Sequence, residues 1–110
     1  MANTFKNAYL DVTSSAQTIY TAPASTTSIV LTLRATNVDG AADDTITAEV
    51  FNSGGTPAAK IAHTISVPAD TTIELAGTSK LVLETGDYIQ LTGGAASGDL
   101  EAFASILEIS

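Results

Sequence analysis

Few residues in this chain could take part in acid–base, nucleophilic or metal chemistry. There is one histidine, His63, and there is no cysteine. The alternation of apolar residues puts His63 on the same strand face as Ile61 and Ile65, where a lone histidine is expected in the core or at its rim. A zinc site would need further histidine or cysteine ligands, and no nucleophile motif such as G-x-S-x-G is present. The sequence therefore predicts no catalytic residue and no metal site.

The acidic residues offer two further kinds of chemistry. Asp39, Asp43 and Asp44 fall in one turn-rich segment and could supply oxygen ligands to Ca²⁺, although their spacing differs from that of an EF-hand loop. A solvated turn is the favoured interpretation, and calcium binding stays open as the alternative. A glycosidase needs two carboxylates across a cleft. The glutamates lie on short strands that predict no such cleft, so we expect a protein that is not an enzyme.

The charge of the chain argues against nucleic acid as a partner. Twelve acidic residues oppose four basic ones, which gives a formal net charge of −8. A nucleic-acid surface needs clustered lysine and arginine to neutralise phosphates. The four basic residues are instead scattered along the chain, at Lys6, Arg34, Lys60 and Lys80. We therefore expect no nucleic-acid partner.

Neither a cofactor nor a membrane is predicted as a partner. The glycine pairs at 54–55 and 93–94 are not followed by a helical pattern, so they do not form a phosphate-cradling loop. No segment approaches the ~20 apolar residues of a membrane span. The opening residues 1–6 lack the basic and then apolar pattern of a signal peptide. We therefore expect a product that is used without passing through a secretory pathway.

Short β-strands are the elements that must position these residues. Two-residue alternation recurs along the chain with turn signals between the runs. Threonine often lies beside isoleucine, leucine and valine, which favours pleated strands because β-branched side chains fit them. The predicted strands cover residues 8–12, 17–22, 27–38, 45–51, 59–67, 72–76, 81–84, 88–92 and 99–109.

This spacing predicts an all-β fold, an antiparallel β-sandwich of eight or nine short strands with Greek-key or jelly-roll topology. The length fits one domain over residues 1–110. Residues 1–7 are expected to form an N-terminal arm, because chain termini are ordered only when they are tied down. In the strand over 27–38, one face is expected to carry Ile29, Leu31, Leu33 and Ala35.

The predicted last strand is apolar on both faces. Leu100, Ala102, Ala104 and Ile106 share one face, and Phe103, Leu107 and Ile109 share the other. Two apolar faces indicate burial on both sides, so this is either a central strand partly covered by a loop or a strand that meets another subunit. Phe51 raises the same question, because alternation puts it on the polar side of its strand. The candidate interface residues are therefore Phe5, Phe51, Phe103, Leu107 and Ile109.

Four segments resemble short structural proteins of tailed bacteriophages, and the resemblance covers most of the chain. They are Met1–Phe5, Thr18–Ala24, Lys80–Asp87 and Ser105–Ser110. The shared motifs are strand-and-turn patterns, and the family brings no catalytic residues to carry over. The resemblance implies a virion component that is assembled in the bacterial cytoplasm and is present in many copies. Small β-sandwich proteins of this kind often decorate or cement the capsid, commonly as trimers.

The expected function is therefore that of a bacteriophage virion structural protein, most of all a capsid decoration or cement protein. Its expected partners are the major capsid protein or other virion proteins, and a homo-oligomer, with a trimer favoured. The alternative is a ligand-binding β-sandwich module, a carbohydrate- or receptor-binding component of a tail or fibre. That alternative needs a concave site with exposed tyrosines, and the absence of tryptophan weakens it.

Overall fold

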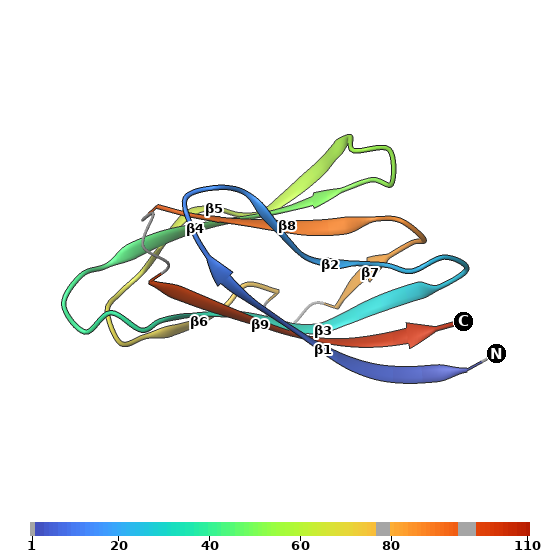
Figure 1. Cartoon of the computed structure of the whole chain (residues 1–110), viewed down its shortest axis with the longest axis horizontal. Coiled ribbons are helices and arrows are strands. Elements are labelled where there is room, and N and C mark those ends of the chain that lie inside the picture. Colours follow the sequence, from blue (N-terminus) through green and yellow to red (C-terminus); the bar gives the residue numbers. More distant parts are fainter. Residues whose placement is uncertain (1, 77–79, 95–98) are drawn as a thin grey trace.

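The computed structural model describes residues 2–76, 80–94 and 99–110, and these residues form two stacked antiparallel sheets (Figure 1). The strands are β1 (Asn3–Val12), β2 (Gln17–Thr21), β3 (Thr27–Asn37), β4 (Asp44–Phe51), β5 (Pro57–Val67), β6 (Thr72–Glu74), β7 (Leu81–Leu83), β8 (Tyr88–Gly93) and β9 (Leu100–Ile109). Within the described ranges there is no helix, and so none that is long and apolar enough to cross a bilayer.

The strand order is that of a jelly roll. Sheet 1 has the order β1-β9-β3-β6, with β7 also pairing with β3, and sheet 2 has the order β2-β8-β4-β5. Each of the first four strands lies in the opposite sheet from the strand before it, as Figure 1 shows. The short strands β6 and β7 pair with opposite ends of β3 and together occupy the place of one long strand. The predicted antiparallel sandwich of eight or nine strands is confirmed, and the observed order is of the jelly-roll type.

The core lies between the sheets and is aliphatic. Alternate residues of each strand point inward, because successive side chains of a strand lie on opposite faces. Burying a leucine or isoleucine stabilises the fold by about 1.5–3 kcal/mol, so both sheets contribute to the stability of one core. The largest fully buried apolar side chains are Val12, Val30, Leu33, Ile46, Val67, Leu83, Ile89, Leu91, Leu100 and Ile106.

A β-bulge in β3 changes which residues face the core. The register of β3 against β9 shifts between Val30 and Thr32, so Leu31 is an extra residue on its strand. One extra residue exchanges the two faces on either side of it. Val30 is therefore buried with Leu33, whereas Ile29 pairs with Leu107 on the outer face. The prediction that Ile29 and Leu31 share one strand face with Leu33 and Ala35 is wrong for this reason.

A second irregularity moves His63 out of the core. Ile46 pairs with Ile65 and Ala48 pairs with Ala62, so two residues of β5 lie opposite Thr47 alone. The backbone of Thr64 has a φ of 51°, which is rare for a β-branched residue. His63 is exposed here, and Ala62 is the buried residue of this stretch. The expected core or rim position of His63 is therefore corrected to an exposed bulge on an edge strand.

The expected N-terminal arm is a strand instead. From Asn3 onward, β1 pairs with β9 over its whole length, with Asn3 opposite Ile109 and Val12 opposite Leu100. Ala2 and Ser110 also exchange backbone hydrogen bonds of 3.1 and 3.0 Å, and Figure 1 shows the two chain ends side by side. The sequence pattern did not predict this pairing, because the inward side chains of residues 3–7 are the polar Thr4 and Lys6. Residues 3–7 therefore lack the apolar alternation that indicates a strand.

The turn between β7 and β8 depends on a glycine. Gly86 has a φ of 86°, a left-handed conformation that glycine adopts without strain. A Cβ atom at this position would lie 2.5 Å from the Cβ atom of Ser53. Glycine is therefore required both by the backbone of the turn and by the close approach of the β4–β5 loop.

Candidate interaction face

The outer surface of sheet 1 carries a band of apolar side chains that no described residue covers. The band crosses the sheet in two rows. One row pairs Phe5 with Leu107, Leu107 with Ile29, and Ile29 with Val82, across β1, β9, β3 and β7. The other row pairs Tyr9 with Phe103 and Phe103 with Arg34. We call the surface formed by Phe5, Tyr9, Ile29, Val82, Phe103 and Leu107 the apolar face.

Exposure within the apolar face is greatest along its β1 side. The side chains of Phe5 and Tyr9 are 74% and 71% exposed, and Val82 is 60% exposed. Leu107 and Phe103 on the central strand are half-buried, because strands lie on both sides of them. Contiguous exposed apolar groups are uncommon on monomeric proteins and mark interaction sites. The arrangement of these side chains therefore suits contact with another macromolecule.

Aromatic contacts hold the second row in place. The rings of Tyr9 and Phe103 have their centroids 5.5 Å apart and are tilted by 34°. The guanidinium carbon of Arg34 lies 5.2 Å from the centroid of the Phe103 ring, which is within the range of a cation–π interaction. Phe103 is therefore fixed between an aromatic ring and a cation on neighbouring strands.

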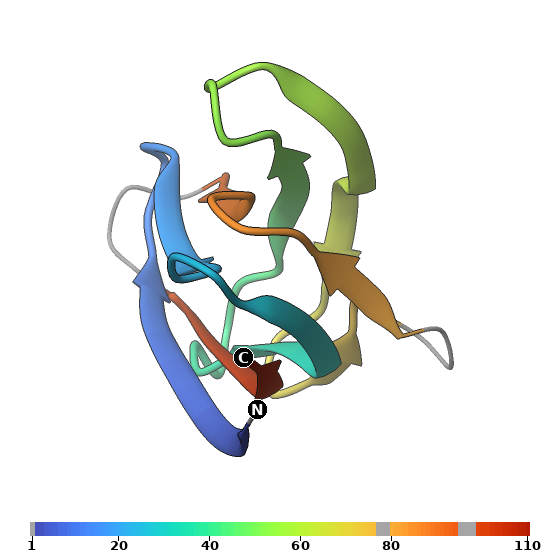
Figure 2. The same ribbon diagram turned by 90° about the vertical axis from the view of Figure 1, so that its right-hand side faces the viewer.

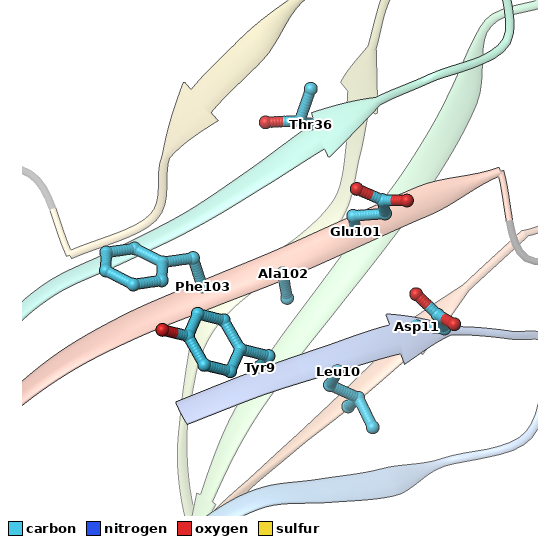
Figure 3. Close-up of a pocket in the computed structure, with 7 residues that line it drawn as sticks. All are labelled: Tyr9, Leu10, Asp11, Thr36, Glu101, Ala102 and Phe103. Atoms are coloured by element: carbon cyan, nitrogen blue, oxygen red, sulfur yellow. The ribbon is translucent and has the colours of Figure 1, made fainter. Parts of the chain in front are cut away.

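A shallow depression of about 410 Å³ adjoins this row. Figure 3 shows the rings of Tyr9 and Phe103 at one end and the carboxylates of Asp11 and Glu101 at the other, with Thr36 across from Glu101. The depression thus combines an exposed aromatic surface with hydrogen-bond acceptors. This combination suits a small polar ligand such as a sugar, whose rings stack on aromatic side chains while its hydroxyls bond to carboxylates.

The outer surface of sheet 2 is mostly polar. The outward side chains of its two central strands, β4 and β8, include Thr47, Glu49, Gln90 and Thr92. Its one aromatic contact among the described residues is the stack of Phe51 on Tyr88, with centroids 5.1 Å apart and planes within 4°. Phe51 therefore has an intramolecular partner at the end of its strand.

The predicted interface residues divide between the two sheets. Phe5, Phe103, Leu107 and Ile109 come together on the outer surface of sheet 1, and Phe51 lies on sheet 2. Sequence reasoning missed the residues that complete the band, which are Tyr9, Ile29 and Val82. Tyr9 could have been found, because it follows Phe5 by four residues and so shares its strand face. Ile29 could not, because the bulge in β3 reverses its side.

A buried polar cluster closes the sandwich near the chain ends. The Tyr20 hydroxyl donates to Glu108 Oε2 at 2.5 Å, and it lies 2.7 Å from Ser28 Oγ. Lys6 Nζ lies 3.2 Å from Glu108 Oε1. Burial, together with the hydrogen bond to Glu108, raises the pKa of Tyr20 from 10.0 to about 12. The inward Glu108, only 8% exposed, thus has partners for both of its oxygens.

The aspartates considered for calcium are engaged with backbone amides. Asp39 Oδ1 accepts from the N–H groups of Ala41 and Ala42, and Asp43 Oδ1 accepts from Ala69. Asp44 Oδ1 accepts from the N–H groups of Thr45 and Gly94. Within the described part of the chain, no three histidine, cysteine, aspartate or glutamate side chains are grouped for a metal. Asp39 and Asp43 therefore act here as caps of turns, whereas Asp44 begins β4 and its buried Oδ2 has no hydrogen-bond partner among the described residues.

No protein-family model and no curated protein matches this chain. A chain from the disulfide-linked pili of Bacillus endospore appendages has the same fold, with a TM-score of 0.59 and 13% identity over 99% of the present chain and 87% of that chain. Two chains from infectious bursal disease virus also match.

For the Gx strain of the virus, the TM-score is 0.53 with 12% identity, over 98% of the present chain and 30% of the viral chain. For the T13 viral particle, the TM-score is 0.54 with 9% identity, over 96% of the present chain and 30% of the viral chain. The present chain thus spans under a third of the viral chains. At these identities the likeness establishes a shared fold, a β-sandwich that is found in subunits of a virus and of a pilus.

Proposed function

We propose that this protein is a structural subunit of a bacteriophage virion, a capsid decoration or cement protein that docks on the head through its apolar face. The observation that carries the proposal is the uncovered band of Phe5, Tyr9, Ile29, Val82, Phe103 and Leu107 on the outer surface of sheet 1. The resemblance to short tailed-phage structural proteins supports the virion setting. The proposal includes that the chain is not an enzyme.

Several properties of the molecule suit this role. The apolar face lies on the open surface of a sheet rather than in a deep cavity, so it fits another protein surface better than a small molecule. The net charge of −8 keeps the remaining surface soluble. The pili of the similar fold are disulfide-linked, whereas this chain has no cysteine. Disulfides between copies of this chain are therefore excluded, and the proposed docking uses non-covalent contacts, which gain strength when several copies dock together.

The experiment is to isolate intact particles from cells that produce this protein and to image them by cryo-electron microscopy. We expect density for the jelly roll on the outside of the head in many copies, arranged as the oligomer that the resemblance favours, a trimer. Co-sedimentation of the purified protein with heads that lack it measures the affinity. Absence of the protein from purified particles, together with no binding to heads, would refute the proposal.

The depression beside Tyr9 and Phe103 favours a second candidate, a carbohydrate- or receptor-binding component of a tail or fibre. Its aromatic end and its two carboxylates, Asp11 and Glu101, have the chemistry of a glycan site. A glycan array tests this candidate against the first. Binding that is lost in Glu101→Ala and retained in Glu49→Ala, a matched glutamate on sheet 2, would favour the second candidate, whereas an array without signal would remove it.

A further inference from the structure

The strand β1 is a long sheet edge whose outer side has no partner strand among the described residues. It stands at the end of sheet 1, and β9 on its other side is the strand it pairs with. In Figure 2, β1 runs along the margin of the ribbon with no strand beyond it. An edge of this length offers unpaired N–H and C=O groups to any extended chain, and proteins protect such edges with short strands, prolines or charges. β1 is ten residues long and contains no proline, and its two charged residues are Asp11 and Lys6, of which Lys6 is paired with Glu108 of its own chain.

The hydrogen-bond pattern shows which residues face the open side. Ala2 and Ser110 exchange both of their backbone bonds. In an antiparallel pair such exchanges occur at every second residue, so the even-numbered residues of β1 bond to β9. The odd-numbered residues direct their N–H and C=O groups to the open side, and they are Asn3, Phe5, Asn7, Tyr9 and Asp11.

We propose that β1 pairs antiparallel with β1 of a second copy of this chain, with Asn7 on the two-fold axis. In this register Asn7 lies opposite Asn7 of the second copy, and Phe5 lies opposite its Tyr9. Asn3 lies opposite Asp11. All five odd-numbered residues then exchange backbone hydrogen bonds with their counterparts. The two-fold axis makes the Phe5–Tyr9 pair and the Asn3–Asp11 pair each occur twice, as in an isologous interface.

The side chains at this edge fit a second copy. Phe5 and Tyr9 are the two most exposed large apolar side chains among the described residues, and the register brings them together as cross-strand aromatic pairs, which stabilise antiparallel sheets. Moving the axis to Phe5 or Tyr9 breaks these pairs and shortens the contact. The self-complementary order of the odd residues therefore selects both the occupant and the register.

Charge also permits the contact, although the chain as a whole is strongly acidic. Asp11 is the only charged residue among the five, and it faces the neutral Asn3. On the inner side of β1, Lys6 faces Ala8 of the second copy. Lys6 is already held 3.2 Å from Glu108, so its charge is compensated within its own chain. No like charges are opposed directly across this seam.

The pairing joins the two sheets into one and makes the two apolar faces continuous. It does not depend on docking to a particle, and it is a two-fold contact. It therefore gives a dimer if single chains associate, or joins two trimers if a trimer forms through other surfaces. In either case, removing the contact halves the mass of the assembly.

Asn7→Pro tests this contact without touching the ladder to β9. Proline removes the N–H of residue 7, which faces the open edge, and proline is tolerated at edge positions whose N–H faces solvent. Asn7→Thr is the matched control, because it keeps the N–H and suits a strand. We expect light scattering and sedimentation equilibrium at micromolar concentration to show the mass of Asn7→Pro at half that of the wild type and of Asn7→Thr.

Circular dichroism and thermal melting show whether both variants are folded. An unchanged mass in folded Asn7→Pro, or a monomeric wild type, would overturn the proposal.

A second measurement does not rely on proline. The chain has no cysteine, so Asn7→Cys introduces one thiol, which the two-fold axis brings opposite its copy at a Cα separation of about 5.5 Å, within the range for a disulfide. Mild oxidation should cross-link Asn7→Cys into a dimer on a denaturing gel. Thr18→Cys, an exposed residue on β2 at the edge of sheet 2, is the control and should not cross-link. Equal cross-linking of the two variants would contradict the β1 register.

Discussion

The two outer surfaces of the sandwich have the same architecture and expose different chemistry. Sheet 1 presents Phe5, Tyr9, Phe103 and Leu107, whereas sheet 2 presents Thr47, Glu49, Gln90 and Thr92 around its Phe51–Tyr88 stack. Both sheets bury their inner faces in one core, so packing of the fold restricts the inner side chains of each. An outer face is free of that restriction. The apolar outer face of sheet 1 is therefore the surface that we propose for docking, and the polar outer face of sheet 2 is the one that suits contact with water.

Charge substitutions at matched positions test this difference most strongly. Phe103 is on β9 and Gln90 is on β8, and both lie on central strands with their side chains outward. We expect Phe103→Asp to weaken binding to heads by on the order of tenfold or more, because a buried charge without a partner is costly at an interface. Gln90→Asp should bind like the wild type. Co-sedimentation measures both.

Leu107→Asp provides a second variant on the apolar face in case Phe103→Asp unfolds. Circular dichroism of the free proteins confirms that they are folded. Equal binding by the sheet 1 and sheet 2 variants would show that the apolar face is not the docking surface. Unfolding of both sheet 1 variants would show that this face contributes to the core.

Replacing a leucine by alanine should have different effects on stability in the core and on the apolar face of the same sheet. Leu33 is fully buried on β3, and Leu107 is half-buried on the outside of β9. We expect Leu33→Ala to lower the free energy of unfolding by about 2–5 kcal/mol, because it leaves a cavity. Leu107→Ala should lower it by about 1 kcal/mol, because the site is open to water. Urea denaturation monitored by circular dichroism checks this, and equal losses would contradict it.

Replacing two glutamates in turn compares how much a buried and an exposed ion pair contribute to the free energy of unfolding. Glu108 is buried between the sheets with Tyr20 and Lys6 as partners, and Glu49 forms an exposed pair with Lys60 on sheet 2 at 3.4 Å. Glu108→Ala should cost about 1–3 kcal/mol, because it leaves buried polar groups without partners. Glu49→Ala should cost about 0.2–1 kcal/mol, as is typical of surface pairs. The same denaturation assay applies, and a larger loss for Glu49→Ala would contradict the comparison.

Alkaline pH should slightly lower the stability that the polar cluster around Tyr20 and Glu108 contributes. The folded pKa of Tyr20 is about 12 and its ordinary value is 10.0, so between these pH values the unfolded chain loses a proton that the folded chain keeps. The stability that depends on the Tyr20 hydroxyl is therefore fully present below pH 10 and is lost as the pH rises toward 12. Tyr20→Phe retains the Lys6–Glu108 pair and should show a shallower decline. Melting temperatures across this range measure the difference, and identical slopes would contradict it.

The sequence predicted the strands well, because apolar alternation and turn residues are local signals. The predicted strand over 45–51 differs from β4 by one residue, and that over 81–84 differs from β7 by one. The first strand was predicted five residues too short, since residues 3–7 lack an apolar inner face. What holds them in the sheet is the backbone pairing with β9, at the far end of the chain, which no local pattern can reveal.

By itself, the sequence determined an aliphatic β-sandwich with inward and outward residues alternating along each strand, because this alternation is a two-residue period that can be recognised from neighbouring residues alone. It also determined that the last strand is apolar on both faces. Only the tertiary structure decided the jelly-roll order, the bulges that turn Ile29 outward and expose His63, and the joining of Phe5, Tyr9, Phe103 and Leu107 into one surface. Those features depend on pairings between residues as much as 106 positions apart, such as Asn3 and Ile109, and a one-residue change of register exchanges the two faces of a strand.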